Sequence, residues 1–233
     1  MHYEAILFDM DGVLIDTRQS VTAFWQALAA EHQVQLTPAD LEQHIYGCLA
    51  GHTLDILFPQ LDAQARAAVM ARGLSYESGL TYTEIPGAVA LLRRLKRFGI
   101  PTALVTSGSE NKVGHVSRQL GLDGLFAERV VGSDIQHGKP DPEAYALAAQ
   151  KLHRPPEVCL VFEDSISGVR AAVAAGACCI GVQTPVEAPA LLAAGAAAVM
   201  PDFMSIQVVP ANNENSRWIL RAGSAYQFPL GAC

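Results

Sequence analysis

The sequence predicts an α/β fold, a doubly wound parallel sheet with a small helical cap domain inserted after the first strand. Short apolar runs of strand length alternate with helical patterns across residues 86–200, whereas residues 17–81 contain helical patterns and no convincing strand. The 233 residues are 50% hydrophobic and 17% charged, a composition that excludes intrinsic disorder. A chain of this length buries roughly 70–75% of its unfolded surface, so its core needs no disulfide or zinc support.

Six apolar runs have the length and β-branched content of strands that are buried on both faces, as in a parallel sheet. They are residues 4–8, 102–105, 129–132, 158–162, 178–182 and 197–200. Helical patterns between them predict helices at 88–98, 143–152 and 167–175. Because strands and helices alternate, we expect a series of right-handed βαβ units.

The segment after the first strand is predicted to be helical throughout. Apolar residues recur at helical spacing from Val21 to Leu28, and Asp62 is placed to cap a later helix. Ordinary connections between a strand and a helix are much shorter than this segment. We therefore predict an α/β core at residues 1–16 and 82–210, with a cap domain at 17–81. Residues 211–233 form a tail to which we assign no element.

Charge and hydropathy restrict the classes of partner. With 16 basic and 23 acidic residues the net charge is −7, which argues against a general binder of nucleic acid or of anionic membranes. No apolar stretch reaches the ~18 residues of a membrane span, and the N-terminus lacks the pattern of a signal peptide. The five cysteines are scattered without a C-x-x-C pair, which indicates reduced thiols. We expect a cytoplasmic monomer.

Acidic residues gather directly after the first predicted strand. Asp9 and Asp11 lie where ligands bind in open parallel sheets, beyond the carboxyl ends of the strands. Two neighbouring carboxylates repel each other unless a cation or a proton intervenes. Gly12 permits the turn that would bring both side chains to one place. The alternative is an aspartate-rich loop that only caps the next helix.

A second pair of acids, Glu163 and Asp164, follows the strand at 158–162. A cation of the magnesium type prefers carboxylate oxygens, water and substrate phosphate, so Asp9 and Asp164 are candidate metal ligands. Capping of the following helix by Asp164 is the competing interpretation.

Two further stretches suit a phosphate group. Thr106, Ser107 and Gly108 offer hydroxyl and backbone N–H groups before a helix, although the same residues are common in ordinary turns. Lys139 stands between Gly138 and Pro140, which would hold its ammonium group in one direction. A solvated surface lysine is the alternative.

Together these four stretches resemble the four motifs of the haloacid dehalogenase-like hydrolases, in the phosphatase branch that carries a helical cap. The motifs occur in the expected order, as Asp9-Met-Asp11-Gly-Val-Leu-Ile-Asp, Thr106-Ser107-Gly108, Lys139-Pro140 and Glu163-Asp164. The resemblance is strongest to phosphatases of sugar and glycerol phosphates and to β-phosphoglucomutase. It implies a phosphatase of small phosphorylated metabolites with a Rossmann-like core.

The resemblance also implies roles for the motif residues. Asp9 would attack phosphorus to give an aspartyl-phosphate, and Asp11 would act as the acid and base. Mg²⁺ would bind Asp9, Asp11 through its backbone carbonyl, and Asp164. Lys139 would neutralise Asp9 and the phosphate, and Glu163 would orient waters or Lys139. Residues 106–108 would hold the phosphate oxygens.

Substrate selection would fall to the cap, where residues 46–53 are expected to form a loop over the site. Gly51 and His52 are the candidate substrate contacts, and His52 competes with a plain surface interpretation. Relatives that bind bisphosphates often have a basic residue here, whereas this sequence has Cys48 and Leu49. This departure favours a monophosphate with a neutral, hydroxylated body.

A phosphomutase similar to β-phosphoglucomutase stays the main alternative function. A receiver-type domain that only accepts a phosphoryl group on aspartate is less favoured, because such domains lack a cap and have no need of Asp11. A true dehalogenase is also disfavoured, since its chemistry needs neither Asp11 nor a metal.

Overall fold

The computed structural model describes residues 2–213, 216–222 and 226–231. Its centre is a six-stranded sheet, parallel throughout, with the strand order β5-β4-β1-β6-β7-β8. The strands are β1 (Ala5–Phe8), β4 (Thr102–Val105), β5 (Glu128–Val130), β6 (Cys159–Glu163), β7 (Cys178–Val182) and β8 (Ala198–Met200). The predicted parallel α/β fold is confirmed.

Successive side chains of the strands point to opposite faces, so each face of the sheet carries its own apolar cluster. On one face Ile6 and Phe8 pack with α5 (Ala88–Arg97) and α6 (Glu110–Leu120). On the other, Ala5 and Leu7 belong to a cluster with α7 (Glu143–Lys151), α8 (Ile166–Ala174) and α9 (Ala188–Ala194). Helices on both faces make the sheet doubly wound.

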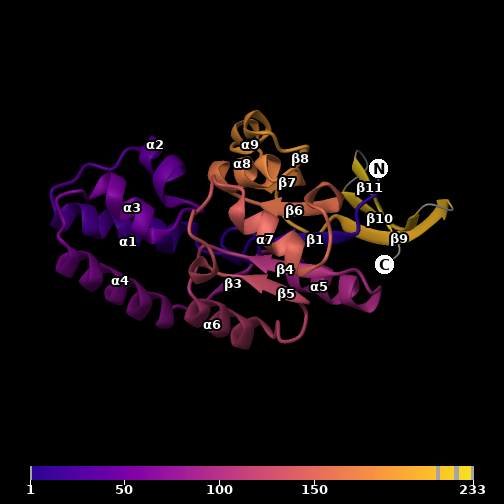
Figure 1. Cartoon of the computed structure of the whole chain (residues 1–233), viewed down its shortest axis with the longest axis horizontal. Coiled ribbons are helices and arrows are strands. Elements are labelled where there is room, and N and C mark those ends of the chain that lie inside the picture. Colours follow the sequence, from indigo (N-terminus) through magenta and orange to yellow (C-terminus); the bar gives the residue numbers. More distant parts are fainter. Residues whose placement is uncertain (1, 214–215, 223–225, 232–233) are drawn as a thin grey trace.

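The inserted segment forms a separate group of helices at one end of the molecule (Figure 1). It contains α1 (Arg18–Glu31), α2 (Pro38–Asp40), a π-helical turn (Leu41–Ile45), α3 (Ala50–Leu57) and α4 (Ala63–Ser78). These helices share a third apolar cluster, centred on Trp25, Leu54 and Phe58. Asp62 caps α4 as predicted, because its carboxylate accepts a hydrogen bond of 2.8 Å from the Ala65 N–H. The division into core and cap domains stays a proposal that these separate clusters support.

One expectation for this segment is wrong. Residues 46–53 do not form a loop throughout, because α3 begins at Ala50 and contains both Gly51 and His52. Leu49 precedes it in an extended conformation without a side-chain cap, so the usual N-cap signal was missing from the sequence.

Two short strands join the helical segment to the sheet. β2 (Ile15–Asp16) pairs antiparallel with β3 (Thr83–Glu84), so the chain leaves and re-enters the α/β unit along one narrow ribbon. Asp11 lies just before this ribbon on one side, and Glu77 on α4 lies just before it on the other.

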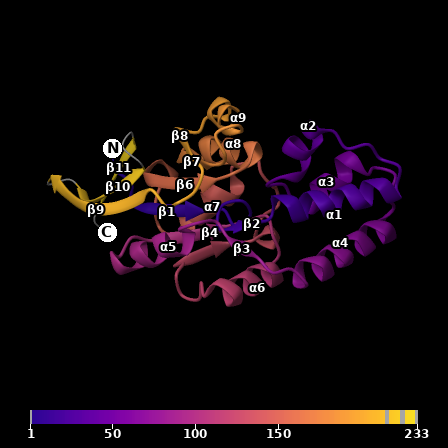
Figure 2. The same cartoon turned by 180° about the vertical axis from the view of Figure 1, so that it is seen from behind.

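The tail that the sequence left unassigned contains strands. β9 (Ile206–Asn213), β10 (Ser216–Ala222) and β11 (Tyr226–Leu230) form an antiparallel sheet at the end of the molecule opposite α1–α4 (Figure 2). The predicted core boundary at residue 210 falls inside β9. Trp218 stacks on Phe98 with ring centroids 4.0 Å apart, which packs this sheet against the end of α5. The last two residues of the tail, Ala232 and Cys233, lie outside the described residues.

Within the described ranges, no helix combines the length and the apolar character that a membrane span requires.

Candidate active site

The topology brings three of the predicted motifs to one edge of the sheet. β1 lies between β4 and β6, and the chain reverses its winding direction here, which is where open α/β sheets bind ligands. Asp9 follows β1, Thr106 follows β4, and Asp164 follows β6. All three line a cavity of about 1210 Å³ between this edge and the helices of the inserted segment.

Asp9 is held in a buried ion-pair network. Lys139 Nζ lies 2.5 Å from Asp9 Oδ1 and 2.6 Å from Glu163 Oε1, and the Tyr145 hydroxyl donates to the same Glu163 oxygen at 3.0 Å. Burial raises the pKa of Asp9 to about 7; Lys139 opposes this shift, while Glu163 and Asp11 add to it. Burial opposes the charged form of Lys139, but the two carboxylates outweigh it and hold the pKa of Lys139 above its usual value.

Glu163 has no oxygen to spare for a metal. Its Oε1 takes hydrogen bonds from Lys139 and Tyr145, and its Oε2 takes them from the Ser165 N–H at 2.9 Å and the Ser165 hydroxyl at 3.0 Å. The carboxylate also fills the space beside Gly168, where an added Cβ would lie 1.7 Å from Oε1. This arrangement supports the predicted role of Glu163 in orienting Lys139.

Asp164 is a buried carboxylate without a close partner. Among the described residues none donates it a hydrogen bond, and its ion pair with Arg18 spans 3.9 Å. Burial raises the pKa of Asp164 well above its usual value, and the charges of Glu163 and Asp9 add to the shift. The loop after β1 passes directly over it, since a Cβ at Gly12 would lie 2.1 Å from Asp164 Oδ2. An uncompensated carboxylate beside Asp9 is the kind of place that a divalent cation fits.

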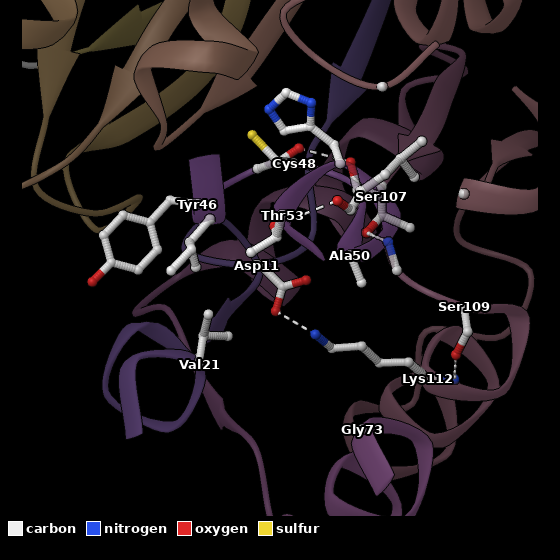
Figure 3. Close-up of a pocket in the computed structure, with 18 of the residues that line it drawn as sticks. Asp11, Val21, Tyr46, Cys48, Ala50, Thr53, Gly73, Ser107, Ser109 and Lys112 are labelled. Carbon is white, nitrogen blue, oxygen red and sulfur yellow. Dashed lines mark hydrogen bonds and ion pairs between the residues drawn. The ribbon is translucent and has the colours of Figure 1, made fainter. Parts of the chain in front are cut away.

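Asp11 belongs to a second network, which the sequence reasoning missed. Its Oδ1 accepts a hydrogen bond of 2.7 Å from Lys112 Nζ (Figure 3). The same oxygen accepts one from the Thr17 hydroxyl, also at 2.7 Å. Lys112 Nζ also lies 3.1 Å from Glu77 Oε1 on α4. A signal was available: Lys112 shares the buried face of α6 with Val113 and Val116, where a lysine needs a partner.

The predicted phosphate-binding stretch lines the cavity, but its polar groups are partly engaged. The Gly108 N–H donates to Thr106 Oγ1 at 3.0 Å, and the Ser107 hydroxyl donates to the Gly47 carbonyl at 2.7 Å. Ser107 therefore links the sheet edge to the inserted segment. Lys139 is fully buried behind Asp9 and does not line the cavity.

The inserted segment supplies the opposite wall. Cys48, Gly51 and His52 line the cavity, and His52 Nε2 lies 3.4 Å from His44 Nδ1. Leu49 fills the gap to the loop after β5, where a Cβ at Gly138 would lie 2.7 Å from Leu49 Cγ. The rest of this wall is largely apolar and includes Val21, Phe24, Trp25, Val69, Met70 and Leu74.

Comparison with known families agrees with this geometry. The family model described as haloacid dehalogenase-like hydrolase matches residues 3–176. The chain therefore belongs to the haloacid dehalogenase-like hydrolases, and the resemblance drawn from its four motifs is confirmed.

Several relatives are named as phosphatases. Hexitol phosphatase A of Escherichia coli is 35% identical over 82% of this chain and 88% of its own length. A phosphorylated carbohydrates phosphatase of Thermotoga maritima is 34% identical over 84% of this chain and 94% of its own. The crystal structure of β-phosphoglucomutase from Clostridium difficile covers 86% of this chain and 91% of its own with a TM-score of 0.73; at 23% identity it shows the shared fold.

Proposed function

We propose that this protein is a phosphatase that hydrolyses sugar or polyol monophosphates, with Asp9 as the nucleophile and Asp11 as the acid and base. The observation that carries the proposal is the meeting of both carboxylates at one cavity, each paired with a lysine, where the Asp9 side chain is 5% exposed and that of Asp11 is 28% exposed. Two neighbouring acids in different surroundings suit two different roles.

The chemistry follows from these positions. Asp9 attacks the phosphorus atom and forms an aspartyl-phosphate while the bond from phosphorus to the ester oxygen breaks. Asp11 gives the departing oxygen its proton. Asp11 then removes a proton from the water molecule that hydrolyses the aspartyl-phosphate. Lys139 keeps Asp9 in place and offsets its charge, so an anionic substrate meets less repulsion.

Magnesium is the cofactor that the residues fit. The Asp9 and Asp164 carboxylates, with the backbone carbonyl of Asp11, would hold the ion. The assignment is supported by Asp164, which is buried and receives no hydrogen bond from the described residues, its ion pair with Arg18 spanning 3.9 Å. When bound, Mg²⁺ supplies positive charge that offsets the charges of the phosphate and the carboxylates.

A monophosphate with a neutral body suits the opposite wall. Among the described residues that line the cavity, one is an arginine, Arg18, and one is a lysine, Lys112. Both are already paired with carboxylates. A second phosphate would therefore compete with these carboxylates for the cations. Phe24 and Trp25 line this wall, where they supply aromatic surface for the carbon side of a sugar or polyol.

A phosphate-release assay over a panel of phosphorylated metabolites with Mg²⁺ tests the proposal. We expect turnover of hexitol or hexose phosphates by the wild type and none by Asp9→Asn. Conversion of a hexose 1-phosphate to its 6-phosphate, dependent on a bisphosphate primer and without net phosphate release, would favour the phosphomutase instead. Absence of turnover on every ester would contradict both. Cytoplasmic location, a monomeric state and the absence of nucleic-acid binding stay predictions.

A further inference from the structure

Asp11 is held by one of its two carboxylate oxygens. Oδ1 accepts both the Lys112 ammonium group and the Thr17 hydroxyl, each at 2.7 Å. None of the residues that the structure describes donates a hydrogen bond to Oδ2. The proton that Asp11 passes to a leaving group must therefore be carried on Oδ2, the oxygen that is free to face the cavity.

Lys112 has no other task that explains its burial. Its side chain is 5% exposed, and among the described residues its Nζ pairs with two carboxylates, Asp11 at 2.7 Å and Glu77 at 3.1 Å. A buried lysine costs free energy unless its charge is compensated, so both carboxylates are needed to keep it in this position. Lys112 lies on α6 of the α/β unit, whereas Glu77 lies on α4 of the inserted segment.

We propose that Lys112 is a positioning residue, which orients the Asp11 carboxyl group and makes that orientation depend on α4 through Glu77. Lys112 bridges the two carboxylates when α4 packs beside α6 as in this structure, and Asp11 then presents Oδ2 to the leaving oxygen. Thr17 precedes α1 at the other connection to the inserted segment. The two hydrogen bonds that Oδ1 accepts therefore both depend on the position of that segment. This inference rests on the proposed function, because it assigns Asp11 the role of proton donor.

Leaving-group dependence separates positioning from a purely structural role. An alkyl phosphate leaves as an alkoxide and needs the proton, whereas p-nitrophenolate is stable without one. For Lys112→Met we expect kcat to fall about 30-fold on a hexitol phosphate and about 3-fold on p-nitrophenyl phosphate, with little change in KM, because general acid catalysis typically contributes 10²–10⁴-fold. A structural role would lower both rates by the same factor.

Glu77→Gln provides the second variant, since the Glu77 side chain is 29% exposed and its loss is compatible with folding even if Lys112→Met is not. We expect a loss of about 5-fold, again selective for the hexitol phosphate, because Lys112 keeps its contact with Asp11 while its ion pair with α4 is reduced to a hydrogen bond to a neutral amide. The double variant should lose no more than Lys112→Met alone. Lys96→Met, an exposed lysine on α5, is the matched control and should resemble the wild type.

The outcomes are distinguishable. A wild type without phosphatase activity would overturn the proposed function, and this inference with it. An active wild type whose Lys112→Met and Glu77→Gln variants lose equal factors on both esters, or lose nothing, would overturn the inference alone. Selective loss on the hexitol phosphate in Glu77→Gln supports it, and an unchanged Glu77→Gln beside a selective loss in Lys112→Met would overturn the dependence on α4.

Discussion

Two lysine-centred clusters flank the same cavity, and they differ in which parts of the chain they join. The Lys139 cluster (Asp9, Lys139, Tyr145 and Glu163) lies wholly within the α/β unit, and its ion pairs are almost inaccessible to solvent. The Lys112 cluster (Asp11, Thr17, Glu77 and Lys112) joins that unit to α1 and α4, and its carboxylates are 28–29% exposed.

The difference separates two tasks. A nucleophile needs the same surroundings with every substrate, and a dry cluster within one rigid unit provides them. Under the proposed function, Asp11 is the proton donor and the inserted segment selects the leaving group. A cluster shared with that segment would link the position of the donor to the position of the segment. Substitutions in the first cluster should therefore affect all esters, and those in the second should affect esters according to their leaving groups.

The largest effect is expected for Asp9→Asn. The amide cannot act as the nucleophile, so phosphate release should fall by about 10⁴-fold or more on alkyl and aryl esters alike. Asp16→Asn is the matched control from the same motif, and its exposed side chain should leave the rate unchanged. An Asp9→Asn enzyme that hydrolysed p-nitrophenyl phosphate at the wild-type rate would refute the assignment.

Asp11→Asn comes next and tests the other cluster. Without a proton donor, kcat on a hexitol phosphate should fall by about 10³-fold, and the loss on p-nitrophenyl phosphate should be smaller by about tenfold. Steady-state kinetics on both esters measures the contrast. Equal losses on the two substrates would show that the clusters do not divide the chemistry as proposed.

Stability should also separate the two lysines. Lys139→Met leaves Asp9 and Glu163 buried without their cation, which should lower the free energy of unfolding by about 3 kcal/mol. Lys112→Met should cost about 1 kcal/mol, because water reaches its partners. Denaturant titrations of both variants check this difference. A larger loss for Lys112→Met would reverse the comparison.

The smallest effect concerns the metal. Mg²⁺ at ten times its dissociation constant should stabilise the wild type by about 1.4 kcal/mol and raise Tm by a few degrees. Asp164→Asn should abolish this increase, whereas Glu77→Gln should retain it, since Glu77 belongs to the other cluster. A thermal shift of equal size in Asp164→Asn would place the ion elsewhere.

Sequence reasoning found one cluster better than the other for a physical reason. Asp9 and Asp164 follow buried strands and Glu163 is the last residue of one. Parallel strands bring their carboxyl ends to one edge whatever the rest of the chain does. Lys112 and Glu77 lie inside helices, where no motif marks them, and they meet only because α4 packs beside α6.

The sequence alone determined the parallel sheet, the inserted helices and the gathering of acids at the strand ends, because periodicity and strand length are local properties. The three-dimensional arrangement alone decided which oxygen of Asp11 is held, that Ser107 reaches Gly47, and that the tail forms a second sheet against α5. Those features depend on contacts between segments distant along the chain. Pro210 and Pro229, which weaken a strand prediction, lie within the strands of that second sheet.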